Sequence, residues 1–433
     1  MTEKRRLILI ELNEVNFEVA RHYVDRLKLD NFRRLFANGV RRTSSEGTYE
    51  QLEPWIQWVS AHSGQTAAEH GIFRLGDIVG QQVPQFFEQL ESRGLRVGAV
   101  SPMNAENRLK RPAYFVPDPW TKTPSDPSLW SRLLTRAVSQ AVNDNSEGRI
   151  TLLNALALGA GLLRFARPKN YRRYADLARR SRGAPWRKAL FLDLFLNDLH
   201  LGLLDKHRPD FSTLFLNAGA HIQHHYFLNS PHVATDGPRN PGWYVAASED
   251  PLAEMFQVYD GILGEYLDRR DTSLLIATGL TQVPYPYVTF YYRPKAHETL
   301  LRQLGLSPKA VHPRMTRDFL VEFEDDAQAL AAERLLRGLT SSTDGVALFE
   351  EVDNRGASLY VTLTYPNEVT PSTTVLGCAN PLKLQDHVVF VAVKNGMHDA
   401  NGFICCHGDM ARFAPTDGAH VKSLHTAVLD FFA

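Results

Sequence analysis

Short apolar runs alternate along most of the chain with segments whose apolar residues recur every three or four positions. Residues 7–12 and 95–100 have the first pattern, which is typical of buried strands, and residues 19–38 and 85–93 have the spacing of helices. This alternation predicts an α/β fold with a mostly parallel sheet flanked by helices. Further core strands are expected at 214–216, 274–277 and 388–393.

Two stretches interrupt the alternation. Residues 126–206 are rich in Leu, Ala and Arg and have a helical pattern, which predicts a helical insertion. Residues 301–380 contain a strand pattern, a helix pattern and a second strand pattern, which predict a small α+β insertion subdomain. The α/β core is therefore expected in three parts, at 1–125, 207–300 and 381–433.

Composition excludes several classes of protein. The 48 basic and 48 acidic residues cancel, so no strong field favours nucleic acid or an anionic membrane. The three cysteines (Cys378, Cys405 and Cys406) are too few for a disulfide framework and favour a reducing compartment. The longest apolar stretch, 152–163, has about half the length that a bilayer span needs. We expect a soluble cytoplasmic protein with no transmembrane segment, no nucleic-acid partner and a small-molecule or glycan substrate; the oligomeric state stays open.

A cluster of histidines follows the apolar run at 214–216. His221, His224 and His225 lie within five positions of one another, together with Gln223. Open α/β sheets bind ligands beyond the carboxyl ends of their strands, and imidazole is a common metal ligand and acid–base group. The cluster therefore predicts a site, and the alternative is a polar loop with incidental histidines.

Two earlier segments could supply partners. Glu11 interrupts the first apolar run, and the polar residues Asn13 and Glu14 follow that run directly. Asn13 could instead cap the next helix. A buried carboxylate is costly unless it faces a polar pocket, so Glu11 is expected to act in the site rather than in folding. In the segment 48–77, Glu53 precedes Pro54 and could either join the site or simply complement a helix dipole.

The order of these features resembles the alkaline phosphatase superfamily, in its phosphodiesterase and nucleotide-pyrophosphatase branch. The resemblance covers roughly the whole chain outside the two insertions, and the EHGIF turn is its most specific piece. Its segments are LILIELNE, PWIQWVSAHSGQTAAEHGIF, LFLNAGAHIQHH, LLIATGLTQ and GMHDANGF. The resemblance implies an alkaline-phosphatase-like fold, a metal-dependent site and action on a phosphate ester.

The chain departs from that family at most site positions. Asn13 stands where the family has its first metal-binding Asp, and the hydroxyl nucleophile maps to Pro54 or Glu53. Other family positions map to Asn217 or Ala220 and to residues 278–280, none of them acidic. His224 and His398 remain as metal-type ligands, with His221, His225, Asp399 and Glu11 as candidate substitutes. A two-zinc site needs several carboxylates, so we expect at most one divalent ion, with zinc favoured, or no metal.

The candidate residues suit a polyhydroxylated ligand, which needs many hydrogen bonds and an apolar stacking face. The first hypothesis is a hydrolase or transferase acting on a phosphate ester of a sugar, nucleotide or glycan intermediate. The alternatives are metal-free glycan processing by Glu and His, and a non-catalytic binding protein. The expected catalytic residues are Glu11, Asn13, Glu53, His221, Gln223 and His225, the expected metal ligands are His224 and His398, and the expected substrate-binding residues are Trp55, Trp58, Tyr285, Arg293 and Asp399.

Overall fold

The computed structural model describes residues 5–143, 151–313 and 317–433 of the chain. It divides into two compact units. Unit 1 comprises Met1–Ala234, Ser248–Pro284 and Gly396–Ala433, and unit 2 comprises Thr235–Ala247 and Tyr285–Asn395. The division into five parts expected from the sequence stays a prediction.

Unit 1 is built on an eight-stranded sheet that confirms the predicted α/β class. Strand β1 (Leu7–Leu12) lies at its centre and pairs in parallel with β5 and β6. Among the described pairings of this sheet, only those of β16 with β6 and β2 are antiparallel. The order is β17 (Ala419–His420), β2 (Arg41–Ser44), β16 (Asn401–His407), β6 (Ser273–Ala277), β1, β5 (Phe211–Leu216), β3 (Val97–Val100) and β4 (Tyr114–Val116).

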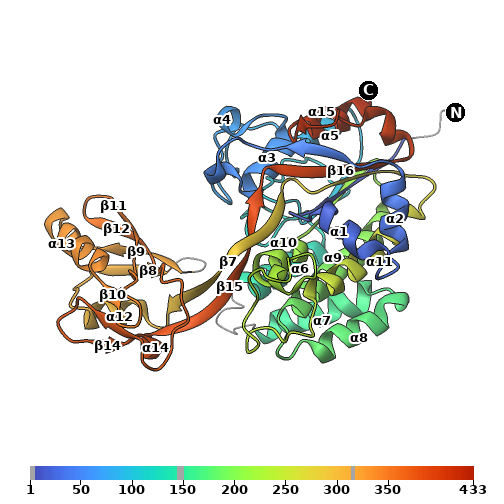
Figure 1. Cartoon of the computed structure of the whole chain (residues 1–433). Coiled ribbons are helices and arrows are strands. Elements are labelled where there is room, and N and C mark those ends of the chain that lie inside the picture. The colour runs from blue at the N-terminus through green and yellow to red at the C-terminus, as the bar shows by residue number, and fades with distance from the viewer. Residues whose placement is uncertain (1–4, 144–150, 314–316) are drawn as a thin grey trace. The chain divides into compact units, whose positions relative to one another are not determined.

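Helices cover both faces of this sheet (Figure 1). Side chains alternate along a strand, so Leu7 and Leu9 of β1 share a core with Trp58 and Phe215, whereas Ile8 is buried on the opposite face. The first face is covered by α3 (Pro54–Ser63), α5 (Phe86–Ser92) and α15 (Ser423–Phe431). The opposite face is covered by α1 (Phe17–Val24), α2 (Asp30–Ala37), α9 (Trp186–His207), α10 (Ala218–Tyr226) and α11 (Pro251–Leu267).

The helix predicted over 19–38 is wrong as a single element, because the chain forms α1 and α2 with a turn between them. Lys28 in that turn has a φ of 53°, a left-handed conformation that ends the first helix. Amphipathic spacing continues across the turn, which is why the pattern does not reveal it. The smaller helical elements of unit 1 are α4 (Ala67–His70), η1 (Tyr49–Gln51), η3 (Pro168–Asn170), η4 (Phe227–Asn229) and η5 (Gly408–Phe413).

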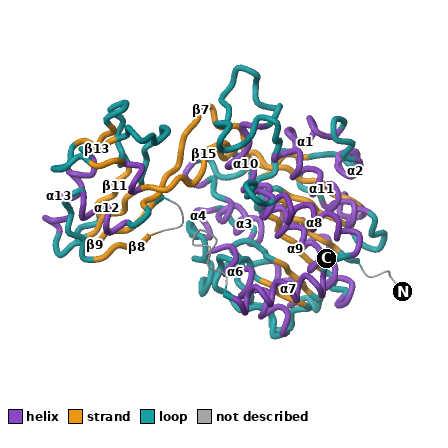
Figure 2. The backbone as a smooth tube through the Cα atoms, turned by 90° about the horizontal axis from the view of Figure 1, so that it is seen from below, coloured by secondary structure: helices purple, strands orange, loops and turns teal. Residues whose placement is uncertain are grey.

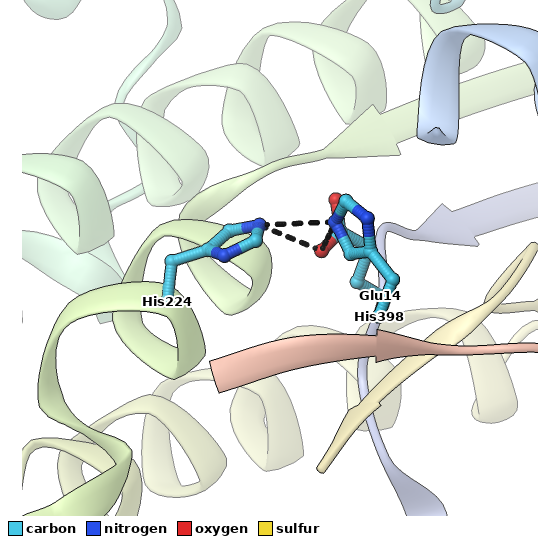
Figure 3. A group of neighbouring side chains, drawn as sticks. All are labelled: Glu14, His224 and His398. Carbon is cyan, nitrogen blue, oxygen red and sulfur yellow. Dashed lines mark hydrogen bonds and ion pairs between the residues drawn. The ribbon is translucent and has the colours of Figure 1, made fainter. Parts of the chain in front are cut away.

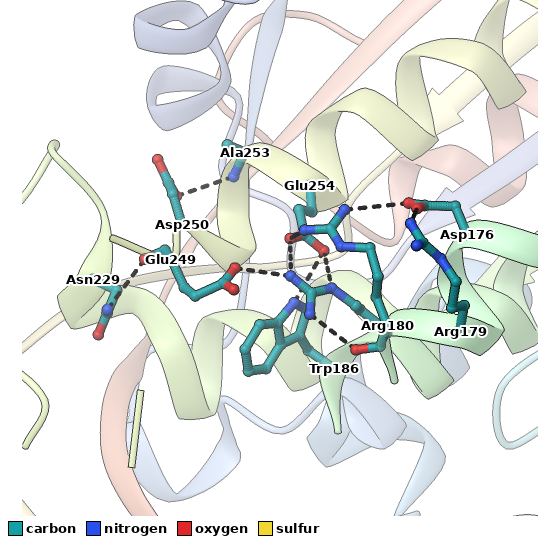
Figure 4. Close-up of polar contacts among 10 residues, drawn as sticks. Asp176, Arg179, Arg180, Trp186, Asn229, Glu249, Asp250, Ala253 and Glu254 are labelled. Carbon is teal, nitrogen blue, oxygen red and sulfur yellow. Dashed lines mark hydrogen bonds and ion pairs between the residues drawn. The ribbon is translucent and has the colours of Figure 1, made fainter. Parts of the chain in front are cut away.

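The stretch 126–206 is helical, as expected. Helices α6 (Leu129–Asn143), α7 (Leu152–Phe165), α8 (Tyr171–Arg180) and α9 lie together in Figure 2. Buried Arg187 of α9 donates to Glu254 of α11 and to Glu249, and Arg180 of α8 pairs with Glu254 (Figure 4). These ion pairs join three helices and neutralise part of the basic run in α8. No helix in the described ranges is both long and apolar enough to cross a bilayer.

Unit 2 has its own core beneath a four-stranded sheet. Phe319, Val321, Leu336 and Leu359 are buried in it. The sheet has the order β11 (Glu351–Asn354), β12 (Ser358–Thr362), β9 (Asp318–Glu322) and β8 (Ala310–Pro313), and its strands pair in an antiparallel manner. The other elements are α12 (His297–Gln303), α13 (Asp326–Arg337), α14 (Leu384–His387) and the strands β10 (Thr340–Ser341), β13 (Thr374–Leu376) and β14 (Leu382–Lys383).

The expected core strand at 388–393 is wrong as part of the large sheet. It belongs to β15 (Val388–Asp399), which pairs with β7 (Thr281–Pro294) in a separate two-stranded sheet. Val388 and Val393 are buried in the core of unit 2, whereas Val389 and Val391 are exposed, so the run is not buried on both faces. In the large sheet, β16 takes the place beside β6.

Candidate metal centre

The carboxyl ends of β1, β5 and β6 lie at one edge of the sheet. Leu12 is opposite Leu216, and Glu11 is opposite Ala277. Beyond this edge the Asn13 amide donates to the Leu216 carbonyl (3.1 Å), and the Glu14 amide donates to the Thr278 carbonyl (3.0 Å). Glu14 has a φ of 59°, a conformation that costs free energy in a residue with a side chain and often marks a functional turn.

Three side chains converge beyond this edge: Glu14, His224 of α10 and His398 at the end of β15 (Figure 3). Glu14 Oε2 lies 3.0 Å from His224 Nε2 and 3.2 Å from His398 Nε2, and the two nitrogens lie 3.3 Å apart. One ligand atom from each residue lies within 4.8 Å of the others. His224 and His398, the two metal ligands predicted from the sequence, are therefore neighbours.

The Glu14 carboxylate is also held by two amides. Gln282 Nε2 donates to Oε2, and Asn13 Nδ2 donates to Oε1 (3.2 Å). Asn13 is itself fixed, because Trp58 Nε1 donates to its Oδ1 (2.8 Å) and its Nδ2 also donates to Asn217 (2.8 Å). These contacts orient the carboxylate toward the two histidines.

Helix α10 is fixed at its start and again at Gln223. Asp193 of α9 accepts hydrogen bonds from the amides of Asn217 (3.2 Å) and Ala218 (2.8 Å), which satisfies donors at the start of α10. Gln223 donates to the Glu14 carbonyl (2.8 Å) and accepts from the Asn16 amide (3.2 Å). Gln223 therefore fixes the turn that carries Glu14 and does not belong to the group of three.

Glu53 lies beside the group. Its Oε2 is 3.9 Å from His398 Nδ1. It is the residue that precedes α3, and its side chain makes no capping hydrogen bond, so the alternative that it complements the helix dipole stays open. The side chains of Glu53 and His224 are 32% and 34% exposed, whereas His398 and Glu14 are 11% and 2% exposed. Solvent and small ligands can therefore reach the group at His224 and Glu53.

The pKa values of the two carboxyl groups of the site, Glu14 and Glu53, are shifted in opposite directions. Burial alone would raise the pKa of Glu14, but the charges and hydrogen bonds of His398 and His224 lower it well below its usual range. Burial raises the pKa of Glu53 to about 7, although His398 opposes the rise. Burial also lowers the pKa of His221 to about 4 and that of His225 well below its usual value, so both imidazoles are neutral at pH 7.

Glu11, His221 and His225 lie outside the group of three, although both histidines are on α10 with His224. Glu11 is fully buried and contacts His62 Nε2 (3.1 Å) and the Thr213 hydroxyl (2.8 Å) within the core below α3. His221 and His225 face each other on α10, with ring centroids 4.9 Å apart.

The expected substrate-binding residues are also dispersed. Trp58 is buried, Trp55 donates to the Phe73 carbonyl, and Asp399 accepts from the Asn401 amide within a turn. Tyr285 and Arg293 belong to unit 2, where Lys394 lies over the Tyr285 ring at 4.1 Å.

One residue of the group, Glu14, and one residue that holds it, Gln282, lie outside the expected catalytic, metal-binding and substrate-binding residues. Glu14 lies beside the two histidines, one position after Asn13, which the resemblance aligned with a metal-binding Asp. Gln282 lies at the end of the LLIATGLTQ segment. The displacement follows from the left-handed turn at Glu14, which the hydrophobic pattern does not show. A search for polar residues just beyond each strand would find Glu14, two positions after β1, but not Gln282, which lies within β7.

The donor set fits one divalent ion. Two imidazole nitrogens and one carboxylate are the protein ligands of several catalytic zinc sites, which keep a fourth position for water or substrate. The same set does not fit two ions, because a single carboxylate among the three described ligands cannot bridge them or balance four positive charges.

No protein-family model matches the chain, and no curated protein matches it. Solved structures do match it over nearly its whole length. The phosphonoacetate hydrolase of Sinorhizobium meliloti 1021 is 13% identical, with 99% of this chain and 96% of that chain covered and a TM-score of 0.45. Human ectonucleotide pyrophosphatase/phosphodiesterase 5 is 9% identical (98% and 94% covered, TM-score 0.43). The alkaline phosphatase of Thermus thermophilus is 16% identical (98% and 91% covered, TM-score 0.42).

Proposed function

We propose that the chain is a hydrolase or transferase that acts on a phosphate ester and uses one divalent ion, with zinc favoured, held by Glu14, His224 and His398. The observation that carries this proposal is the convergence of the three ligand atoms within 4.8 Å. The residues come from three distant segments of the sequence, so local chain geometry alone does not bring them together. Three protein ligands leave a coordination position for a substrate.

The residues of the chain have distinct tasks in this proposal. A divalent ion in this place would supply Lewis acidity toward a phosphoryl oxygen. Glu14 carries the negative charge that balances part of the ion, and Gln282 and Asn13 hold its carboxylate in orientation. Glu53, beside His398 and partly exposed, is placed to give a proton to a leaving group or to take one from an attacking water.

The position of Glu53 bears on which group attacks the phosphate ester. It lies at the start of α3, where the resembling family carries its hydroxyl nucleophile. Its carboxyl group replaces that hydroxyl, so we propose attack by water or by an acceptor hydroxyl on the phosphate ester rather than through a serine or threonine of the enzyme at this position. The substrate that we propose is a phosphate ester of a sugar, nucleotide or glycan intermediate.

One observation favours a second candidate, a metal-free binding protein. Glu14 already accepts hydrogen bonds from Gln282 and Asn13 and contacts both histidines, so its carboxylate is satisfied without an ion. Such a network could hold α10, β1 and β15 together as a purely structural contact.

The experiment compares chelator-treated protein with protein reloaded with zinc or manganese, on p-nitrophenyl phosphate, bis-p-nitrophenyl phosphate and a panel of sugar phosphates and nucleotides. We expect turnover that depends on the ion and falls at least about a hundredfold, or ~2.7 kcal/mol, in Glu14→Gln and His398→Ala. His420→Ala is the matched control, since His420 and Glu46 form another His–Glu pair at 3.4 Å in unit 1. Absence of both ion binding and turnover would favour the metal-free binding protein, and turnover unaffected by Glu14→Gln would contradict the proposal.

A further inference from the structure

Unit 1 has a surface cavity that none of the residues of the metal centre lines. A surface cavity of about 400 Å³ lies between α6 and the loop that follows β4, and Trp120, Lys122, Arg132, Thr135 and Arg136 are among its lining residues. Its volume is within the range of small-molecule sites, which starts at about 300 Å³.

Three basic side chains line the cavity. Lys122, Arg132 and Arg136 are exposed, and none forms an ion pair with a residue in the described ranges. Arg132 and Arg136 are four positions apart on one face of α6, where like charges repel and weaken a helix. An anion bound between them would remove that repulsion.

Asp118 does not neutralise these cations, although it also lines the cavity. Its Oδ1 accepts from the amides of Trp120 and Thr121, both at 2.7 Å. Its Oδ2 accepts from the Thr121 hydroxyl (2.7 Å) and the Asn104 amide (2.8 Å). Both oxygens are therefore committed to shaping the loop, and the Asn104 side chain ties the same loop to the Trp55 carbonyl of α3 (2.9 Å). The wall of the cavity is preorganised by these bonds.

A neutral hydroxyl completes the wall. Thr135 lies between the two arginines on α6, and its Oγ1 is buried without a hydrogen-bond partner in the described structure. Trp120, which packs against the core of unit 1, adds an apolar aromatic surface to the same cavity.

We propose that this cavity binds a phosphorylated organic molecule, with the phosphate held by Arg132, Arg136 and Lys122 and the planar or apolar part against Trp120. Guanidinium groups bind phosphate through paired hydrogen bonds. A nucleoside monophosphate has both the anion and the flat ring that these residues recognise. The proposal is independent of the metal centre and of the function proposed for it.

The test uses full-length protein carrying His398→Ala and treated with chelator, so that the metal centre does not bind the probe. Titrations follow tryptophan fluorescence and heat with AMP, adenosine and inorganic phosphate. We expect AMP to bind more tightly than phosphate, and adenosine to bind more weakly than AMP. The double variant Arg132→Ala/Arg136→Ala should weaken AMP binding at least about tenfold, with Trp120→Leu reducing AMP but not phosphate binding.

Arg182→Ala is the matched control, because Arg182 is an exposed arginine of the same helical stretch that does not line the cavity. Thermal melts confirm that the surface variants are folded. No binding of AMP at millimolar concentration, or binding that the double arginine variant leaves unchanged, would overturn the proposal. An equal loss with Arg182→Ala would show non-specific charge attraction and would overturn it as well.

Discussion

The Nε2 atoms of His224 and His398 lie 3.3 Å apart, although the two residues are 174 positions apart in the chain. Both nitrogens also lie within 3.2 Å of Glu14 Oε2. A neutral imidazole carries one ring proton, so the three contacts depend on which nitrogens are protonated. An ion would replace this proton-dependent arrangement with three ligand bonds.

The first prediction concerns the number of ions. We expect the chain to bind one zinc ion at most, because the described group offers two imidazoles and a single carboxylate. Either His224→Ala or His398→Ala should weaken zinc binding at least about tenfold, which is ~1.4 kcal/mol. Elemental analysis and calorimetric titration measure these quantities, and His221→Ala is the control on the same helix. Two stoichiometric zinc ions per chain would contradict the prediction.

The second prediction concerns Glu11. Its contacts to His62 and Thr213 lie in the core, so the structure favours a stabilising role, whereas the sequence alone favours a role in the site. Glu11→Ala should lower the free energy of unfolding by about 1–3 kcal/mol, because it leaves a buried imidazole and hydroxyl without their partner. Denaturant unfolding measures this, and zinc binding should persist in the folded variant. Normal stability with lost zinc binding or turnover would return Glu11 to the site.

The third prediction concerns Gly396, two positions before His398. A Cβ atom there would collide with the Gln282 side-chain oxygen and lie 2.8 Å from the Gln223 carbonyl oxygen. Gly396→Ala should therefore displace the end of β15, cost about 1–3 kcal/mol of stability and weaken zinc binding. Gly159→Ala is the control, because its Cβ would meet no atom within 4 Å and alanine favours the helix. Equal behaviour of the two variants would show that the close approach of β15 does not position His398.

The fourth prediction concerns acid stability. His200 is buried between the Tyr266 hydroxyl (2.8 Å) and the Ser212 hydroxyl (2.7 Å), and burial lowers its pKa to about 3. An unfolded histidine has a pKa of about 6.5 and takes up a proton first as the pH falls. His200 thus favours folding above pH 6.5, and this contribution is lost progressively between about pH 6.5 and 3.

Urea unfolding at several pH values tests this dependence. His200→Gln should reduce the slope of stability against pH between about pH 6 and 4 by about one proton, or ~1.4 kcal/mol per pH unit. Tyr266→Phe is the control, since it removes a partner of His200 and leaves the titrating group in place. An unchanged slope in His200→Gln would show that other groups cause the acid sensitivity.

The sequence predicts the fold class because apolar runs and helical spacing report burial directly. It also points to His224 and His398, which lie close together. The argument from the ends of parallel strands holds for His224, on the helix that follows β5, but not for His398, because β15 lies outside the large sheet. The direction of Glu11 follows from the period of a strand: it is on the same face as Leu7 and Leu9, whose side chains form the core with Trp58. A polar residue in an apolar run therefore does not by itself identify a site.

Other features depend on contacts between distant segments. Glu14 reaches the histidines because its backbone adopts a left-handed turn tied to the Thr278 carbonyl, and no pattern of residue types shows this. The run at 388–393 looks like any buried strand, and its pairing with β7 is decided by the fold of the whole unit. The helix break at Lys28 is similarly invisible to amphipathic spacing.

The positions of the three ligands have a consequence for the assembly of the protein. Residues 14 and 224 are synthesised well before residue 398, and the segment 285–395 of unit 2 lies between the last two. The group can therefore be completed only after the chain has passed through unit 2 and returned to unit 1. An ion at a hundredfold excess over its dissociation constant would add about 2.7 kcal/mol to the stability of the state in which the three residues have come together. Binding of the ion would then show that the segment carrying residue 398 has packed against the segments carrying residues 14 and 224. Ion binding could therefore be used to follow the refolding of a chain that has been cut within unit 2.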